Sequence, residues 1–140
     1  MSLLLLDSNI IRLLGPIPAE EQPLLALYWS DLRGHEYAIS FQTHAESLKG
    51  AYLDGWGLKR VAHLEARLSR FFLIYPDQET LKVWAMLVAH AQKKGRRLAG
   101  EDAWIGATAV QHQLPLISHD QDLVGLDFPG LVVINRVSPK

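Results

Sequence analysis

The chain contains no cysteine among its 140 residues. Disulfide bonds, cysteine-ligated zinc sites and thiol nucleophiles are therefore excluded. Long apolar runs are missing as well, because runs such as Leu3 to Leu6 and Leu131 to Ile134 are far too short to span a bilayer. No basic segment precedes an apolar core at the start of the chain, as a secretion signal requires. We expect a soluble protein of the reducing cytoplasm with no membrane partner.

A large net charge is also missing, since the formal charge is only −1. The distribution is uneven, however: residues 59–97 carry nine basic and three acidic side chains, so this part is +6 and the remainder is −7. Such segregation can create one face that attracts a polyanion and another that holds cations. An ordinary solvated helix surface is the simpler alternative. The basic residues that we expect to contact a nucleic acid are Lys93, Lys94, Arg96 and Arg97.

Short apolar segments alternate with helical patterns along the chain. Strands are predicted at residues 3–6, 37–40, 71–75, 116–118 and 131–134. Helices are predicted directly after Asp7, with Ser8 or Asn9 as the cap, and at about 18–33, 42–53, 58–70, 78–94 and 101–113. Because no hairpin signal separates the strands, the pattern predicts one α/β domain over residues 1–140. Its central parallel sheet should have four or five strands, covered by helices on both faces.

Two of these helices carry patterns that predict how they pack. Asp77 precedes the helix at 78–94 and can cap it. Its buried stripe is expected to consist of Leu81, Trp84, Ala85, Val88 and Ala91. In the helix at 101–113, Gly106 and Ala109 follow Asp102 by four and seven residues, so this helix face is small enough for a close neighbour.

Four carboxylates fall near the predicted strand ends. Asp7 directly follows the first strand, Glu46 lies early in the helix after the second, and Asp120 follows the fourth. Asp102 opens the helix that leads into that fourth strand. The functional crevice of an open α/β sheet lies beyond the carboxyl ends of its strands, so these acids should meet. Each alone has an ordinary alternative role as a helix-start, turn or surface charge.

Carboxylates that meet without a cation repel one another and are hard to keep ionised. Oxygen ligands suit Mg²⁺ or Mn²⁺, which can polarise a phosphoryl oxygen and acidify water. The acids therefore predict metal-dependent phosphodiester hydrolysis. Asp122 follows Asp120 closely, and alternation along an extended segment would turn both to the same side. A zinc deaminase site is excluded, because the H-x-E element at His44 has no accompanying cysteines.

Four segments in order resemble the successive motifs of PIN-domain ribonucleases, and among these the chain is most similar to the VapC toxins of toxin–antitoxin pairs. The segments are residues 4–10, 40–46, 101–109 and 116–123. Departures are small: Ser8 and Ser118 stand where threonine is common, and Gly106 stands where alanine is common.

The resemblance implies a Mg²⁺- or Mn²⁺-dependent endoribonuclease. By position, its acidic pocket would consist of Asp7, Glu46, Asp102 and Asp120, with Asp122 as a further ligand and Asn9 and Ser118 as polar helpers. RNA would be the substrate. The resemblance also implies a cognate antitoxin, whose tail can push a basic side chain into the acidic pocket, and a homodimer. Two alternatives stay open, namely a non-catalytic RNA- or partner-binding module of the same fold and a phosphatase acting on small molecules.

Overall fold

The computed structural model describes residues 2–15 and 18–137 of the chain. Five strands form one sheet in the order β3-β2-β1-β4-β5, and every neighbouring pair is parallel. The strands are β1 (Leu3–Leu6), β2 (Glu36–Ser40), β3 (Phe72–Ile74), β4 (Leu116–Ile117) and β5 (Val133–Ile134). The predicted parallel α/β sheet is confirmed.

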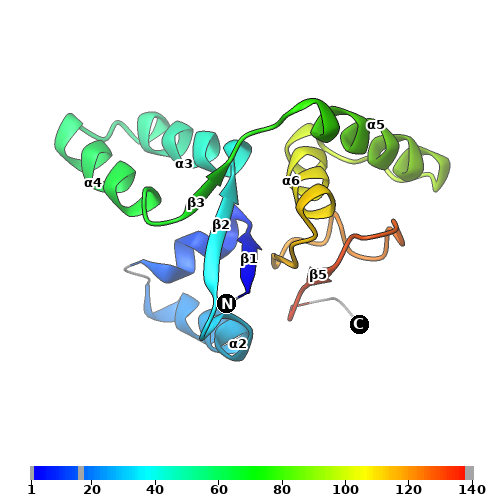
Figure 1. Cartoon of the computed structure of the whole chain (residues 1–140). Coiled ribbons are helices and arrows are strands. Elements are labelled where there is room, and N and C mark those ends of the chain that lie inside the picture. The colour runs from blue at the N-terminus through cyan, green and yellow to red at the C-terminus, as the bar shows by residue number, and fades with distance from the viewer. Residues whose placement is uncertain (1, 16–17, 138–140) are drawn as a thin grey trace.

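Helices pack on both faces of this sheet, as predicted. They are α1 (Ser8–Ile11), α2 (Gln22–Leu32), α3 (Phe41–Leu53), α4 (Leu58–Leu68), α5 (Gln78–Lys93) and α6 (Gly100–His112), with short 3₁₀ turns η1 (Arg12–Leu14) and η2 (Ala19–Glu21). Figure 1 shows α5 and α6 on one side of the strands and α4 on the other. Within the described ranges, no helix combines the length and apolarity needed to cross a membrane.

The leucines of β1 supply two separate cores. Leu4 and Leu6 point to the face that packs against Tyr28 of α2 and the buried side of α4. Leu5 points the other way, into the core that contains Leu87 of α5 and the inner side of α6. Side chains alternate along a strand, so an unbroken leucine run is stable only where both faces are covered.

The strand order places a topological switch point between β1 and β4. The chain winds from β1 to β2 and β3 on one side, and then returns to β4 and β5 on the other. Leu6 of β1 is paired with Ile117 of β4, and the amide of Asp7 donates to the carbonyl of Ile117 at 3.0 Å. Ligands of such sheets bind where the connections diverge, beyond the carboxyl ends of the strands. The residues that follow β1 and β4 therefore start side by side in this crevice.

The predicted stripe of α5 was correct for Ala91, and Trp84 and Val88 are partly buried, but it was wrong for Leu81 and Ala85. The buried residues are Thr80, Val83, Leu87 and Ala91, whereas Leu81 is 52% exposed and Ala85 is also exposed. Both stripes have helical spacing, and packing against α6 selects between them. A Cβ atom at Gly106 of α6 would lie 2.8 Å from Cδ2 of Leu87, so the close approach predicted for the Gly106 face of α6 is present.

The cap predicted for α5 is confirmed. The Asp77 side chain accepts from the amide of Thr80 at 3.1 Å, and the Thr80 hydroxyl accepts from the amide of Asp77 at 2.9 Å. These reciprocal bonds satisfy two amides that a helix N-terminus would otherwise leave free.

Candidate functional site

Asp7 sits at the carboxyl end of β1 with only 5% of its surface exposed. One carboxylate oxygen, Oδ1, accepts from the amide of Ser8 at 2.7 Å, and Asp7 is thereby the N-cap of α1. The prediction of Ser8 or Asn9 as cap was wrong, because both already lie inside the helix while Asp7 keeps extended backbone. Burial raises the pKa of Asp7, the bonds from Ser118 and Ser8 oppose this, and the Asp120 charge adds to it.

The hydroxyl of Ser118 connects the polar groups at the ends of β1 and β4. It donates to Oδ2 of Asp7 at 2.8 Å and accepts from the amide of Asp120 at 3.1 Å. The side-chain amide of Asn9 donates to the same hydroxyl at 3.4 Å, and its oxygen accepts from the amide of His119 at 3.4 Å. The two residues predicted as polar helpers, Asn9 and Ser118, thus lie among the predicted acids.

Three carboxylates converge in the crevice. Asp102 in the first turn of α6, Asp120 and Asp122 each offer an oxygen, and these oxygens lie within 4.8 Å of one another. Asp102 is half-buried, whereas Asp120 and Asp122 are exposed on the segment that follows β4, which we call the acidic loop (residues 119–128). An extended segment was expected there, and this was wrong: residues 122–125 form a turn. The turn, rather than strand alternation, brings Asp122 to the same side as Asp120.

The neighbouring carboxylates and burial change the pKa of Asp102 strongly. Its pKa is raised from 3.8 to about 8. Burial is the largest cause, followed by a hydrogen bond with Asp122 and by the negative charges of Asp122, Asp120 and Asp7. A carboxyl group in such surroundings is difficult to ionise unless a cation joins it.

Glu46 lies on α3, apart from the three converging oxygens. Gln42 donates to it at 3.3 Å, and burial together with the charges of Asp7 and Glu101 raises its pKa. Its side chain lines a cavity of about 500 Å³ that Asn9 and residues of α1 and α4 also line. Sequence reasoning missed Glu101, although its place beside Asp102 in the first turn of α6 could have signalled it. The predicted acids thus fall into two groups. Asp102, Asp120 and Asp122 converge, Glu46 lies apart from them, and the charge of Asp7 acts on both Asp102 and Glu46.

Known proteins show the same organisation. Residues 4–129 match the PIN domain. The chain belongs to the PIN domain family. Ribonuclease VapC5 of Mycobacterium tuberculosis is 39% identical over 61 residues, which are 44% of this chain and 45% of that protein. Ribonuclease VapC4 of the same organism is 31% identical over 107 residues, which are 72% of this chain and 78% of that protein.

A solved structure resembles this PIN domain over nearly its whole length. It is described as a toxin-antitoxin complex from Klebsiella pneumoniae, and the likeness covers 95% of this chain and 97% of that one. The TM-score is 0.68 and the sequence identity is 28%. The resemblance to PIN-domain proteins of the VapC kind, drawn above from four short motifs, is confirmed.

The four basic residues that were predicted to contact a nucleic acid divide into two pairs. Lys94 donates to the carbonyl of Leu126 at 2.9 Å, and Arg96 donates to the carbonyl of Asp122 at 2.8 Å. Lys93 and Arg97 are exposed, and their side chains make no hydrogen bond or ion pair with any other described residue. Only the second pair is therefore fully available to a nucleic acid, and RNA binding by these residues stays a prediction.

The donor set of this PIN domain fits a hard divalent cation. All three converging ligand atoms are carboxylate oxygens, the kind that Mg²⁺ and Mn²⁺ prefer. Between residues 2 and 137, leaving aside 16 and 17, no lysine or arginine forms a salt bridge with Asp102, Asp120 or Asp122. The negative charge of the crevice is therefore left for a ligand to neutralise.

Proposed function

We propose that the chain is a Mg²⁺- or Mn²⁺-dependent endoribonuclease and the toxin of a toxin–antitoxin pair. The observation that carries this proposal is the convergence of three carboxylate oxygens within 4.8 Å at the switch point of the sheet. Membership of the PIN family and the relatives named ribonucleases support RNA as the substrate. Oxygen-rich acidic clusters in such a crevice suit phosphoryl chemistry on a polyanion.

The position of each acidic residue indicates its role in the proposed reaction. Asp102, Asp120 and Asp122 would hold the cation directly. A bound Mg²⁺ or Mn²⁺ would supply positive charge at the phosphodiester and acidify the attacking water. Asp7, whose two carboxylate oxygens accept from the Ser8 amide and the Ser118 hydroxyl, adds negative charge at the floor of the site.

Glu46 faces the approaching substrate from the other side of the crevice. It lines the cavity of about 500 Å³ together with Asn9 and Ser47, whose polar groups can bind phosphate and sugar oxygens. Lys93 and Arg97, both exposed, provide charges that attract the RNA backbone.

The same cavity supports an antitoxin partner. Its walls combine the apolar side chains of Ile11 and Leu64 with the charged ends of Arg12 and Arg67, and Glu46 lies at its margin. An amphipathic segment of the antitoxin could cover this surface and extend a basic side chain to Glu46 and the other acids. The solved toxin-antitoxin complex to which the chain is similar supports an antitoxin as the partner. The homodimer stays a prediction, which sedimentation equilibrium of the purified chain would test.

A cleavage assay tests the proposed activity. The purified chain is incubated with mixed cellular RNA, with and without Mn²⁺, and the cut ends are mapped by sequencing. Cleavage at discrete positions should require Mn²⁺ and should fall in Asp102→Asn by more than about 100-fold, above the usual loss for an outer partner of a metal ligand. Asp7→Asn should also lose activity while remaining folded, because asparagine caps helices as well as aspartate does.

Glu65→Gln is the matched control, because Glu65 is an exposed acid on α4 outside the crevice. It should cleave like the original chain. RNA binding without cleavage under any metal, from folded protein free of antitoxin, would favour the non-catalytic module instead. Hydrolysis of a simple phosphomonoester with RNA left intact would favour the phosphatase.

A further inference from the structure

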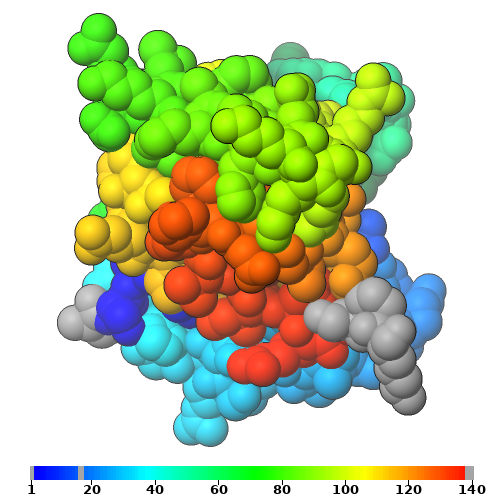
Figure 2. Space-filling view, turned by 90° about the vertical axis from the view of Figure 1, so that its right-hand side faces the viewer, coloured from blue at the N-terminus to red at the C-terminus, as the bar shows by residue number. Residues whose placement is uncertain are grey.

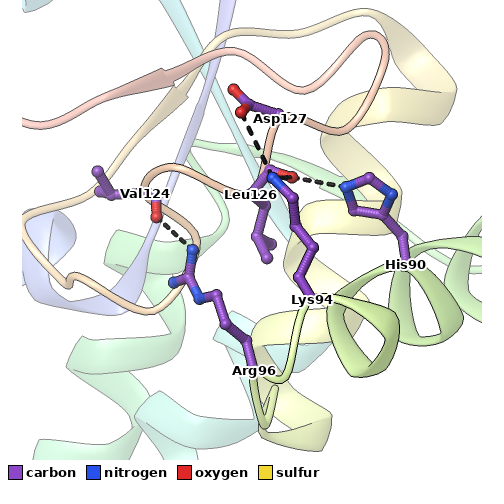
Figure 3. A network of polar contacts seen from close by, with 6 residues as sticks. All are labelled: His90, Lys94, Arg96, Val124, Leu126 and Asp127. Atoms are coloured by element: carbon purple, nitrogen blue, oxygen red, sulfur yellow. Dashed lines mark hydrogen bonds and ion pairs between the residues drawn. The ribbon is translucent and has the colours of Figure 1, made fainter.

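Three basic side chains in the last turn of α5 and just after it contact backbone carbonyls of the acidic loop. The Nε2 atom of His90 and the Nζ atom of Lys94 contact the carbonyl oxygen of Leu126 at 2.6 and 2.9 Å, and Nη1 of Arg96 donates to the carbonyl of Val124 at 2.6 Å (Figure 3). We call these three residues the basic clasp. In Figure 2 the yellow-green end of α5 lies against the orange segment that follows β4.

Arg96 reaches furthest toward the carboxylates. Its Nη2 atom donates to the carbonyl of Asp122 at 2.8 Å and approaches that of Gln121 at 3.5 Å, in addition to the Nη1 bond with Val124. A planar guanidinium presents its donors in a fixed fork, so these contacts restrain the loop in direction as well as in distance. The backbone that Arg96 grips therefore belongs to the same residue, Asp122, whose carboxylate faces Asp102.

The contacts of Arg96 do not involve the carboxylates of Asp120 and Asp122. Arg96 binds peptide oxygens, and no salt bridge between it and Asp120 or Asp122 occurs in the described part of the chain. In the ionised form that binds a cation, carboxylates this close repel one another, and the repulsion pushes the exposed loop away from Asp102. The clasp opposes this movement without neutralising the charge that a cation needs.

Other anchors of the loop lie on both sides of Asp122. At the start of the loop, the Ser118 hydroxyl accepts from the amide of Asp120 at 3.1 Å, and the side chain of Asn135 donates to the carbonyl of Asp120 at 2.8 Å. Leu123 and Leu126 are buried in the core beside Leu87 of α5, and they secure the later part of the loop. Asp120 and Asp122 themselves are exposed. Of the loop contacts that the described side chains of residues 90–96 make, only those of Arg96 reach back as far as Asp122.

Resting on the metal site proposed above, we propose that Arg96 is a positioning residue: it holds the acidic loop so that the carboxylate of Asp122 stays within cation-binding distance of Asp102 and Asp120. Lys94 and His90 support it from the far end of the loop. Arg96 touches neither substrate nor cation in this role, and it acts through the backbone of the residues that do.

The test compares Mn²⁺ affinity, read from the electron paramagnetic resonance signal of free Mn²⁺, in the full chain and its variants. Arg96→Ala should bind Mn²⁺ about tenfold more weakly, the lower end of the loss for outer-shell partners of ligands. Arg96→Lys should fall in between, because an ammonium lacks the fork. Arg97→Ala removes the same charge one residue away from an exposed position, and it should bind like the original chain.

Two further readouts separate positioning from general destabilisation. Amides of residues 121–127 should exchange hydrogen faster in Arg96→Ala than in Arg97→Ala, while β1 and β2 stay protected. RNA cleavage by Arg96→Ala should recover at saturating Mn²⁺ to within a few-fold, because the ligands themselves remain. If Arg96→Ala does not fold, Arg96→Lys and Lys94→Met decide, each with weaker Mn²⁺ binding expected.

The outcomes distinguish the two proposals. Mn²⁺ binding that is equal in the original chain and in the folded Arg96 variants would overturn the positioning role and leave the metal site intact. An equal loss in Arg96→Ala and Arg97→Ala would also overturn it, because general charge would then explain the effect. An original chain that binds no Mn²⁺, like Asp102→Asn, would overturn both proposals.

Discussion

The hydroxyl of Ser118 donates to the buried carboxylate of Asp7 at 2.8 Å across the β1–β4 pair. These residues are separated by 111 positions in the sequence. The bond fixes the Oδ2 atom of Asp7, while the Ser8 amide holds Oδ1. Because the same hydroxyl accepts from the amide of Asp120, it sets the start of the acidic loop relative to the floor of the site.

Replacing this hydroxyl should weaken both the fold and the activity. Ser118→Ala leaves a buried carboxylate oxygen without its partner, which typically costs about 1–3 kcal/mol in the free energy of unfolding. The bond lowers the pKa of Asp7, so its loss should raise that pKa further and move the rise of the pH–activity profile to higher pH. Urea unfolding and cleavage rates as a function of pH measure the two effects.

Ser118→Thr is the matched control, because it keeps the hydroxyl. It should preserve both stability and the pH profile. An Ala variant as stable as the original chain, with an unchanged profile, would show that the bond contributes nothing.

The metal-free protein should lose stability as the pH rises. The pKa of Asp102 is raised from 3.8 to about 8, so between these values the folded chain holds a proton that the unfolded chain has released. Under linkage, the free energy of unfolding then falls as the pH increases from about 4 to about 8. The raised pKa values of Asp7 and Glu46 act in the same direction. Urea unfolding in the presence of a chelator measures the profile.

Asp102→Asn isolates the contribution of this one acid. Burial lowers the pKa of His119, which acts in the opposite sense because the unfolded chain then binds more protons near the ordinary value of 6.5. The quantity to compare is therefore the difference in the free energy of unfolding between the original chain and Asp102→Asn at each pH. A difference that stays constant with pH contradicts the raised pKa of Asp102.

Adding Mn²⁺ should reverse the loss. A ligand that binds only the folded state at 100 times its dissociation constant stabilises it by about 2.7 kcal/mol. The gain should be larger at high pH than at low pH, because the carboxyl group of Asp102 must release its proton to become a ligand. Thermal unfolding with and without Mn²⁺ at two pH values measures it, and Asp102→Asn should respond much less than Glu65→Gln.

Tyr28 tests the contribution of the core that contains Leu4 and Leu6 of β1. Its ring is fully buried, and its hydroxyl accepts from the amide of Arg136 at 3.1 Å while donating to the carbonyl of Ser118 at 3.4 Å. Tyr28→Phe removes both hydrogen bonds and should cost about 1–3 kcal/mol in the free energy of unfolding, because each contributes about 0.5–1.5 kcal/mol. Tyr52→Phe, at an exposed tyrosine, should change it by less than about 0.5 kcal/mol. Equal effects in the two variants would contradict this account.

The fold could be predicted because its main elements carry local signals. The leucine run of β1 ends at an aspartate, and such a run is stable only as a strand covered on both faces. Asp77 precedes a clear helical pattern and does cap α5. Asp7 and Asp120 could be placed in one crevice from their positions after apolar runs, because the carboxyl ends of parallel strands meet at one edge of the sheet.

What escaped prediction depends on contacts between distant segments. The stripe of α5 was misplaced because Leu81 and Val83 both fit helical spacing, and only the packing of Leu87 on Gly106 decides between them. Lys94 and Arg96 have the pattern of solvent-exposed charges, since the peptide carbonyls that they bind leave no trace in the sequence. The turn at residues 122–125 replaced an expected extended segment for the same reason.

The strand order has a consequence for the timing of synthesis. Asp7 is made 111 residues before Ser118, and the partners that face Asp7 follow β4, which joins the sheet beside β1. A nascent chain that stops before Ser118 holds Asp7 and Asp102 without Asp120 and Asp122. The acidic centre therefore cannot assemble until the ribosome has passed β4 and the acidic loop, and shorter translation products lack Asp120 and Asp122.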